Sequence, residues 1–449
     1  MIRLGMAVFR TFIRNIRLGL PAILLVATSL HAATAPAIVI TNLPAYGSFS
    51  NLQGVVLGGN PATQAVAVFI YVPGYGWVSK PTCAQPLTTI QANGSWSANI
   101  TTGGAGDTTA TRVAALLVSN TYSQPCVNPL ANLTTNIYAQ ALAKTVITRP
   151  SPGVRFLSFS GYDWWVKSDA SPVGPGPNYF SDSATNVWTD TNGWLHLRIT
   201  HRTNAWQCAE VISARTFGPG SYRYELNSVV DNLNQLVTLG LFTWSDDPVY
   251  TNREIDVECS RWNIPTDTNN SQFVVQPYYV ANQLVRYRVP PGLADSTHLF
   301  TWETNRISYQ SQTGAYTAAA TNLIAAYVFT NAAAVPQSGD ENVHLNLWLQ
   351  HGNPPTDNNE VEVIIKSFDF IPLGTPPSLV MSSARRSSAG VFQCNLAVQP
   401  DYWYEVQSSS NLLHWAHLTT VLATNSTLTL METNTPVVGP RYYRGVTLP

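Results

Sequence analysis

The stretch that decides the fold reads "NREIDVECSRW" over residues 252–262. Glu254, Asp256 and Glu258 stand at every second position of it, with an aliphatic residue between each pair. In a β-strand, residues two apart share a face, so the three acids point one way and the aliphatic side chains point the other. An exposed acidic strand face is the simple alternative. Like charges this close repel each other, however, and only 11% of this chain is charged, so the pattern favours a functional cluster.

The spacing of the acids fits the cleavage of a sugar acetal. Glycosidases that retain configuration use two carboxyl groups about 5–5.5 Å apart. The Cα atoms of Glu254 and Glu258 are about 13 Å apart on a strand that rises roughly 3.3 Å per residue, and side chains that lean inward shorten that distance. Asp256 stands between them, where it helps to keep one Glu ionised and the other protonated. We therefore predict that all three are catalytic and need no metal or cofactor.

Composition limits the class of protein. With 449 residues, 45% of them hydrophobic, the chain is long enough for two or three domains with real cores. Its net charge of −1 gives no indication of a nucleic-acid or anionic-membrane partner. Asn, Thr, Ser and Gln supply most of the polarity, which is common in extracellular β-proteins that handle neutral polymers.

The N-terminus predicts export. Four Arg residues precede an apolar run over 18–30, and the small-residue segment "HAATAPA" follows. This is the layout of a secretory signal peptide, here assigned to residues 1–35. A membrane anchor is the alternative, but the run is shorter than the roughly 18 residues that a spanning helix needs. We expect a secreted, monomeric mature protein with no membrane association after cleavage.

Two segments rich in Pro and Gly divide the mature chain. "TRPSPGV" (148–154) and "PLGTPPS" (372–378) are typical of linkers. They predict three domains, over residues 36–148, 149–373 and 374–449.

Every domain shows short runs with period-two alternation rather than helical periodicity. Examples are "AVAVFIYV" (65–72), "WLHLRIT" (194–200) and "EVEVIIKSFDFI" (360–371). The predicted class is therefore all-β, with an immunoglobulin-like sandwich first, a larger sandwich in the middle and a small β-module last.

The middle domain resembles a known enzyme family. "EIDVE" is similar to the E-x-D-x-E signature of glycoside hydrolase family 16, which includes lichenases and laminarinases. Flanking segments follow the family's order, namely "NVWTDTNGWLHLRIT" (186–200), "WQCAEVISARTFGPGSYRYEL" (206–226), "LGLFTWSDDP" (239–248), "QFVVQPYY" (272–279) and "VHLNLWLQHG" (343–352). The resemblance implies a jelly-roll sandwich of two curved antiparallel sheets with a cleft across the concave face. It also implies that Glu254 is the nucleophile, Glu258 the general acid/base and Asp256 an assisting acid, with a polysaccharide, most often a β-glucan, as substrate.

Nine further residues are candidates for substrate binding: Trp206, Glu210, Phe242, Trp244, Arg253, Gln276, Tyr278, Asn346 and Trp348. Aromatic rings stack on the apolar faces of pyranose rings, and polar groups fix their orientation. For Trp206 the alternative is a core tryptophan, and for Glu210 it is a surface carboxylate. Arg253 replaces an acidic residue that the family often has, and we expect it to lower the pKa of Glu254 or to favour an anionic polysaccharide. Pro277 removes a ladder donor and predicts an edge or a local shift before Tyr278.

Cysteine and histidine usage gives smaller predictions. Cys83 and Cys126 are a plausible disulfide, whereas Cys208 and Cys259 fall on opposite faces of the predicted sheet, which disfavours a bond between them. The eight His residues show no metal-ligand spacing, although the family resemblance allows a structural calcium at an unknown position.

Three functions remain open. The sequence favours a retaining endo-β-glycanase. A transglycosylase on the same site and a non-catalytic carbohydrate-binding or surface protein are the alternatives.

Overall fold

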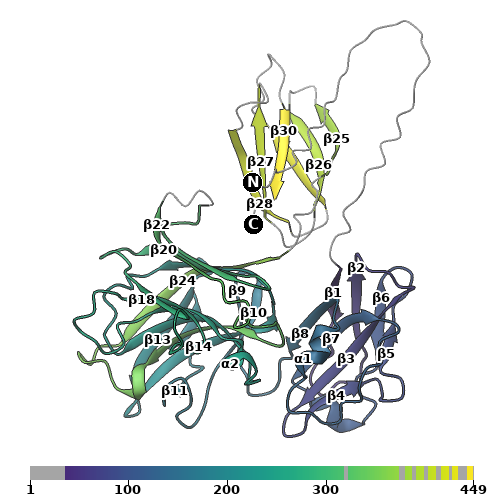
Figure 1. Cartoon of the computed structure of the whole chain (residues 1–449), viewed down its shortest axis with the longest axis horizontal. Helices are drawn as coiled ribbons and strands as arrows, with labels where there is room; N and C mark the ends of the chain where they lie inside the picture. Colours follow the sequence, from purple (N-terminus) through teal and green to yellow (C-terminus); the bar gives the residue numbers. More distant parts are fainter. Residues whose placement is uncertain are drawn as a thin grey trace, which may run out of the picture. The chain divides into compact units, whose positions relative to one another are not determined.

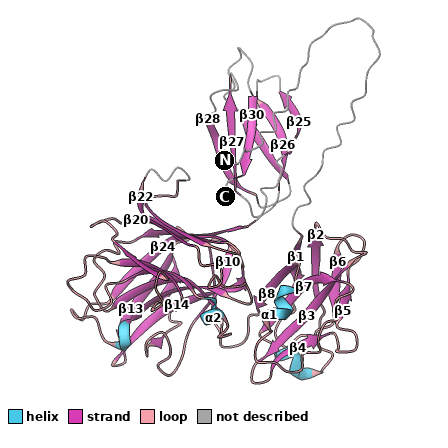
Figure 2. Cartoon of the chain, in the orientation of Figure 1, coloured by secondary structure: helices cyan, strands magenta, loops and turns pink. Residues whose placement is uncertain are grey.

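The computed structural model describes residues 36–317, 322–373, 380–386, 391–398, 403–410, 416–423, 427–432 and 442–447. The predicted signal peptide and most of the predicted second linker lie outside these residues. Strands dominate the described chain, and the few helices are short (Figure 2), so the all-β prediction is confirmed. Among the described helices, none has the length and apolar character needed to cross a membrane.

The N-terminal module is a sandwich of two antiparallel sheets. Its elements are β1 (Ala37–Asn42), β2 (Leu52–Leu57), β3 (Gln64–Val72), β4 (Gly76–Lys80), β5 (Leu87–Thr89), β6 (Ser95–Ala98), β7 (Arg112–Ser119) and β8 (Ala143–Thr148), with the short helices η1 (Ala105–Thr109) and α1 (Thr135–Ala139). One sheet runs β1–β2–β6. In the other, β3 pairs with β4 and β5 on one side and with β7 on the other, and β8 follows β7.

Strand β3 is apolar on both faces because each face is covered by a hydrophobic core. Val66 and Ile70 pack into the core between the two sheets, while Phe69 faces a second core that includes Ile137 of α1. A strand covered on both sides needs a continuous apolar run rather than simple alternation. The predicted disulfide between Cys83 and Cys126 is present.

The central domain contains most of the strands. They are β9 (Phe156–Phe159), β10 (Tyr162–Val166), β11 (Tyr179–Phe180), β12 (Val187–Thr189), β13 (Leu195–Arg202), β14 (Ala205–Thr216), β15 (Gly220–Asn227), β16 (Val237–Trp244), β17 (Ile255–Cys259), β18 (Ser271–Val275), β19 (Leu284–Tyr287), β20 (Asp295–Trp302), β21 (Ile307–Thr313), β22 (Leu323–Phe329), β23 (Asn342–Leu349) and β24 (Val361–Pro372), with α2 (Tyr250–Arg253) and η2 (Gln350–Gly352).

These strands form two antiparallel sheets (Figure 1). The first has the order β9–β10–β14–β23–β16–β17–β18–β19. The second has the order β12–β13–β24–β15–β20–β21–β22. Hairpins of consecutive strands alternate in each sheet with pairs of strands that are far apart in sequence, such as β14–β23 and β15–β24, as in a jelly roll. The predicted sandwich of two antiparallel sheets is therefore confirmed.

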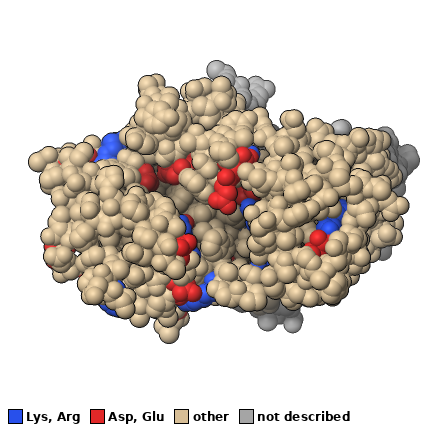
Figure 3. All heavy atoms as spheres, turned by 90° about the horizontal axis from the view of Figure 1, so that it is seen from below, with Lys and Arg blue, Asp and Glu red and all other residues tan. Residues whose placement is uncertain are grey.

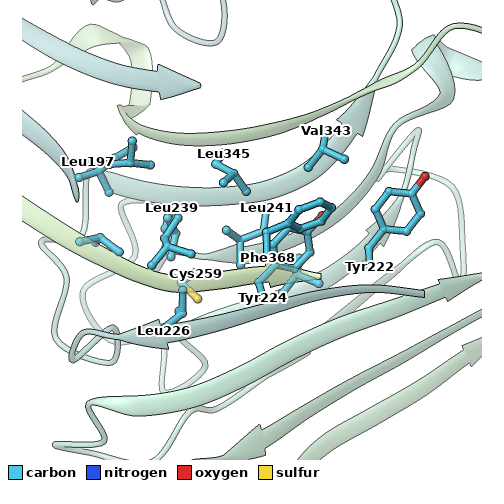
Figure 4. Close-up of a cluster of buried hydrophobic side chains, with 14 of the residues drawn as sticks. Leu197, Tyr222, Tyr224, Leu226, Leu239, Leu241, Cys259, Val343, Leu345 and Phe368 are labelled. Atoms are coloured by element: carbon cyan, nitrogen blue, oxygen red, sulfur yellow. The ribbon is translucent and has the colours of Figure 1, made fainter. Parts of the chain in front are cut away.

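The core between these sheets holds one face of each (Figure 4). Leu239 and Leu241 of β16 and Leu345 of β23 meet Tyr224 of β15 and Phe368 of β24. All five side chains are buried. Because alternate residues of the first sheet fill this core, the residues between them lie on its opposite face.

The C-terminal module also consists of strands. Its described elements are β25 (Val380–Arg386), β26 (Phe392–Ala397), β27 (Trp403–Ser409), β28 (Ala416–Leu422), β29 (Thr427–Glu432) and β30 (Tyr442–Thr447). They form two sheets, β25–β26–β29 and β28–β27–β30, and these sheets enclose a small hydrophobic core. The described residues thus form separate hydrophobic cores in the N-terminal, central and C-terminal parts of the chain.

Candidate active site

The acidic stretch forms the central strand β17 and the residue before it. Ile255, Val257 and Cys259 are fully buried in the core, as parity predicts. Glu254 has an extended backbone (φ −87°, ψ 122°), so it continues the alternation into the strand. The acids therefore share the face of the sheet that turns away from the core, and Asp256 is the most buried of the three.

All three carboxyls have a raised pKa, and burial is the largest cause for each. Burial, together with the charge of Glu258, raises the pKa of Glu254 to about 8, against a hydrogen bond to Asp256 that lowers it. Burial also raises the pKa of Asp256, with the charges of both Glu residues adding to the effect. Burial raises the pKa of Glu258 to about 7. Since the groups titrate together, the cluster as a whole retains protons near neutral pH. The hydrogen bond favours the ionised form of Glu254 and the protonated form of Asp256.

Glu258 has two supporting side chains from the next two strands. Gln272 of β18 donates from Nε2 to Glu258 Oε2 at 2.6 Å. Arg286 of β19 donates to Gln272 Oε1 at 3.2 Å and to Asp267 Oδ2 at 2.6 Å. Arg286 thus fixes the amide of Gln272 with its donor toward Glu258. Both residues lower the pKa of Glu258, which burial raises.

Asp256 and the loop after β18 are also connected. Gln276 donates from Nε2 to Asp256 Oδ2 at 3.1 Å, and its own Oε1 accepts from the backbone N–H of Tyr278 at 2.9 Å. Strand β18 ends at Val275, immediately before the Gln276–Pro277 pair, as the proline predicts. Gln276 therefore supports the acid cluster, and Tyr278 lies in an exposed loop.

A row of residues crosses the same face beside Glu258. Register places Glu258 next to Gly240 of β16, Gly240 next to Asn346 of β23, and Asn346 next to Glu210 of β14. A Cβ on Gly240 would lie 2.5 Å from Asn346 Oδ1, so only glycine leaves room for that amide. Asn346 is buried, and its Oδ1 has no hydrogen-bond partner among the described residues. Such an acceptor suits a sugar hydroxyl.

Glu210 is buried rather than a surface carboxylate. It pairs with Lys167 Nζ at 2.9 Å and with His344 Nδ1 at 2.7 Å. Burial raises its pKa, but the hydrogen bond from His344 and the charge of Lys167 bring that pKa below the ordinary value. Glu210 is thus ionised and fully engaged, and Lys167 and His344 stand beside it at this end of the row.

The predicted aromatic residues differ in exposure. The ring of Phe242 lies 5.0 Å from that of His344 and is nearly buried, so it belongs to the floor of this face. Trp244 is half-buried at the end of β16, two residues after Phe242, which pairs with Asp256. Trp206 and Trp348 are half-buried and pack against the core by one side. Trp206 is therefore partly the core tryptophan that the alternative interpretation describes.

The prediction for Arg253 is wrong. This side chain is fully buried, where it donates to Asp247 Oδ2 at 3.0 Å and to the backbone oxygen of Gln337 at 2.9 Å. It forms no part of an accessible surface and has no place in substrate binding. It also does not lower the pKa of Glu254, which is raised. A buried cation needs a paired anion, and Asp247 is that anion.

Several site residues were missed by the sequence analysis. Gln272 lies four residues before Gln276 and His344 two before Asn346, so strand parity alone places both on the site face. Lys167 comes from a distant segment and Arg286 from the strand after Gln272, and no local pattern identifies either. In the described part of the chain, no group of three or more His, Cys, Asp or Glu side chains is arranged to hold a metal ion.

The raised pKa values predict a falling stability with increasing pH. A carboxyl whose pKa is raised in the folded state contributes stability that is present below the unfolded value and lost as the pH rises through the folded value. For Glu258 this window runs from 4.5 to about 7. The free energy of unfolding, measured by urea titration, is expected to drop by roughly 1–3 kcal/mol more in the wild type than in Glu258→Gln between these values. Equal pH dependence in the two proteins would contradict this electrostatic description.

Comparisons with known proteins give structural likeness only. The chain is similar to a β-glucanase of Bacillus licheniformis, with 19% identity over 50% of this chain and 100% of that one, at a TM-score of 0.37. A β-1,3-1,4-glucanase (lichenase) from a mouse hindgut metagenome gives 19% identity over 49% and 99%, at 0.37. A pseudo β-1,3-glucanase of Mycobacterium tuberculosis gives 18% over 50% and 93%, at 0.38. No family model matches the sequence, and no curated protein does.

Proposed function

We propose that this protein is a glycoside hydrolase that cleaves a polysaccharide, with a β-glucan as the first candidate. The observation that carries the proposal is the acid cluster on β17. Three carboxyls share one face of a central strand, while the alternate residues are locked in the core. Burial raises the pKa of all three, and repulsion adds to it at Glu254 and Asp256, which is typical of catalytic carboxyl groups.

The proposed mechanism is double displacement with retention of configuration. Glu254 attacks the anomeric carbon and forms a glycosyl ester, while Glu258 gives its proton to the departing glycosidic oxygen. Water then attacks the ester carbon, Glu258 takes the water proton, and Glu254 is released as a carboxylate. Asp256 is hydrogen-bonded to Glu254. It helps to keep Glu254 ionised while Glu258 is protonated, so that these two Glu residues carry one negative charge in total.

The charge distribution supports a neutral polymer. On the face shown in Figure 3, Lys, Arg, Asp and Glu are few and other residues cover most of the surface. Next to the acids, the groups suited to a substrate are the amide of Asn346 and the half-buried rings of Trp244 and Trp348. Uncharged acceptors and aromatic rings are what a neutral pyranose chain needs.

A substrate screen tests this function. The purified protein is incubated with lichenan, laminarin, xyloglucan, agarose and carrageenan, and the products are sized. We expect shortened chains from lichenan or laminarin with new reducing ends. Absence of new reducing ends from all five polymers would contradict the hydrolase.

One observation favours a transglycosylase as the second candidate. Tyr278 and Tyr279 are 61% and 77% exposed, with their rings edge to face at 5.6 Å, in the loop that Gln276 joins to Asp256. Exposed rings near the acids suit a second sugar chain as acceptor. Products longer than the starting polysaccharide chains would identify this activity in the same screen.

We also propose that the protein is secreted. The Arg-rich start and the short apolar run support cleavage near residues 32–35. N-terminal sequencing of exported protein is expected to begin between Ala33 and Pro36, and a mature cytoplasmic protein that starts at Met1 would contradict it.

A further inference from the structure

A cavity of about 570 Å³ lies in the N-terminal module, at the open side of its sandwich. Strands β5 and β6 border it. Among the described strands, β5 pairs with β3 alone and β6 pairs with β2 alone, so both are edge strands. The volume is within the range of about 300–1,000 Å³ that small-molecule sites occupy. It belongs to a different domain from the acid cluster.

The lining is polar but uncharged. Eight of its twelve residues are Thr, Ser or Gln, and none is Asp, Glu, Lys, Arg or His. Phosphate, carboxylate and ammonium ligands would find no partner charge here. A hydroxylated neutral ligand finds hydroxyl and amide groups on several sides.

Two buried polar groups at this cavity have no partner. The hydroxyl of Thr88 and the indole N–H of Trp96 make no hydrogen bond among the described residues, although these residues are only 7% and 3% exposed. Thr88 pairs with Val66, which belongs to the same inter-sheet core as Trp96, so both side chains enter the space between the sheets. Buried polar groups are nearly always satisfied, and exceptions need an explanation.

Gly54 keeps the indole in this place. A Cβ there would lie 2.3 Å from the Trp96 ring, so the missing side chain lets the ring lie across β2. The ring is thus held by packing and not by a hydrogen bond, and its N–H is buried without a partner among the described residues.

We propose that this cavity is a second glycan-binding site, which takes a neutral sugar unit through the Thr88 hydroxyl and the Trp96 indole N–H. The ligand class follows from the uncharged lining and the two unpaired polar groups. The proposal goes beyond the hydrolase function, since these groups need a partner whether or not the acids on β17 are catalytic. Binding here would hold the chain on a polymer while leaving the acid cluster unoccupied.

The test reads the site directly. In the full-length Glu254→Ala protein, which leaves an oligosaccharide intact, the indole N–H signals are followed by ¹⁵N NMR during titration with a mixed-linkage β-glucan hexasaccharide. The signal that disappears in Trp96→Phe identifies Trp96. It is expected to shift saturably with the ligand, and an unmoved signal at saturating ligand would overturn the proposal.

Two variants, Thr88→Val and the control Thr63→Val, test the role of the Thr88 hydroxyl. Thr88→Val removes an unpaired hydroxyl at nearly constant volume, so the melting temperature should not fall. Retardation in a barley β-glucan gel is expected to weaken by about 3- to 10-fold, the effect of one lost hydrogen bond. Thr63→Val, an exposed position of the same module outside the cavity, should bind like the wild type. Unchanged retardation of a folded Thr88→Val would overturn the proposal, even if the enzyme proves inactive on every polymer.

Discussion

Glu254→Ala is expected to lower kcat on β-glucan by at least about 10⁴-fold, because no covalent intermediate forms without the nucleophile. The fold should persist. Glu254 is only half-buried, and its removal relieves the repulsion that raises the pKa of Asp256. The measurement is the initial rate of reducing-end release, together with the melting temperature.

Azide gives this variant a diagnostic product. A small anion enters the space that the carboxylate leaves and attacks the anomeric carbon from that side. The glycosyl azide should therefore have inverted configuration, which NMR of the anomeric proton shows. Asp256→Asn is the matched control, and it should lose less activity than Glu254→Ala because Asp256 forms no bond to the sugar. Wild-type rates in Glu254→Ala would end the glycosidase proposal.

Local periodicity explains what the sequence predicted well. The alternation of Glu254, Asp256 and Glu258 with aliphatic residues is a property of five consecutive positions, and a strand in the middle of a sheet preserves it. The same parity places Cys259 on the core side and Cys208 on the other face. Both are buried and unbonded to each other, as predicted.

Arg253 shows where such reasoning fails. Four consecutive residues, Tyr250 to Arg253, have positive φ, between 50° and 64°. The chain therefore leaves the strand alternation just before Glu254, and Arg253 turns toward Asp247. Adjacency in sequence suggested an effect on Glu254, but the local backbone conformation directs the cation elsewhere. Turn geometry of this kind is poorly encoded in single residues.

Long-range pairing explains the remaining differences. Lys167 reaches Glu210 from β10's end, 43 residues away, and Arg286 reaches Gln272 across β18 and β19. Sheet order decides these contacts, and residue spacing does not reveal it. The result is a site whose charges are balanced by residues that no motif contains: a cation and a histidine at Glu210, and a guanidinium behind the amide that holds Glu258.

The groups around Glu258 bear directly on its protonation state and therefore on its catalytic role. Gln272 and Arg286 both favour its ionised form, whereas a general acid must be protonated when the leaving group departs. Burial opposes them and raises its pKa to about 7. A value near neutrality suits a group that donates a proton in one step and accepts one in the next.

Glu258→Ala should consequently lose about 10²–10⁴-fold in kcat on the natural polymer, where protonation of the leaving group is needed. An aryl glycoside with a good leaving group needs no such proton, so its glycosylation step should remain fast and the glycosyl-enzyme should accumulate. Azide should then release it from the face opposite Glu254, with overall retention. If instead azide gives inversion with Glu258→Ala and retention with Glu254→Ala, the two Glu residues exchange roles. The carboxylate that Gln272 and Arg286 keep ionised would then be the nucleophile.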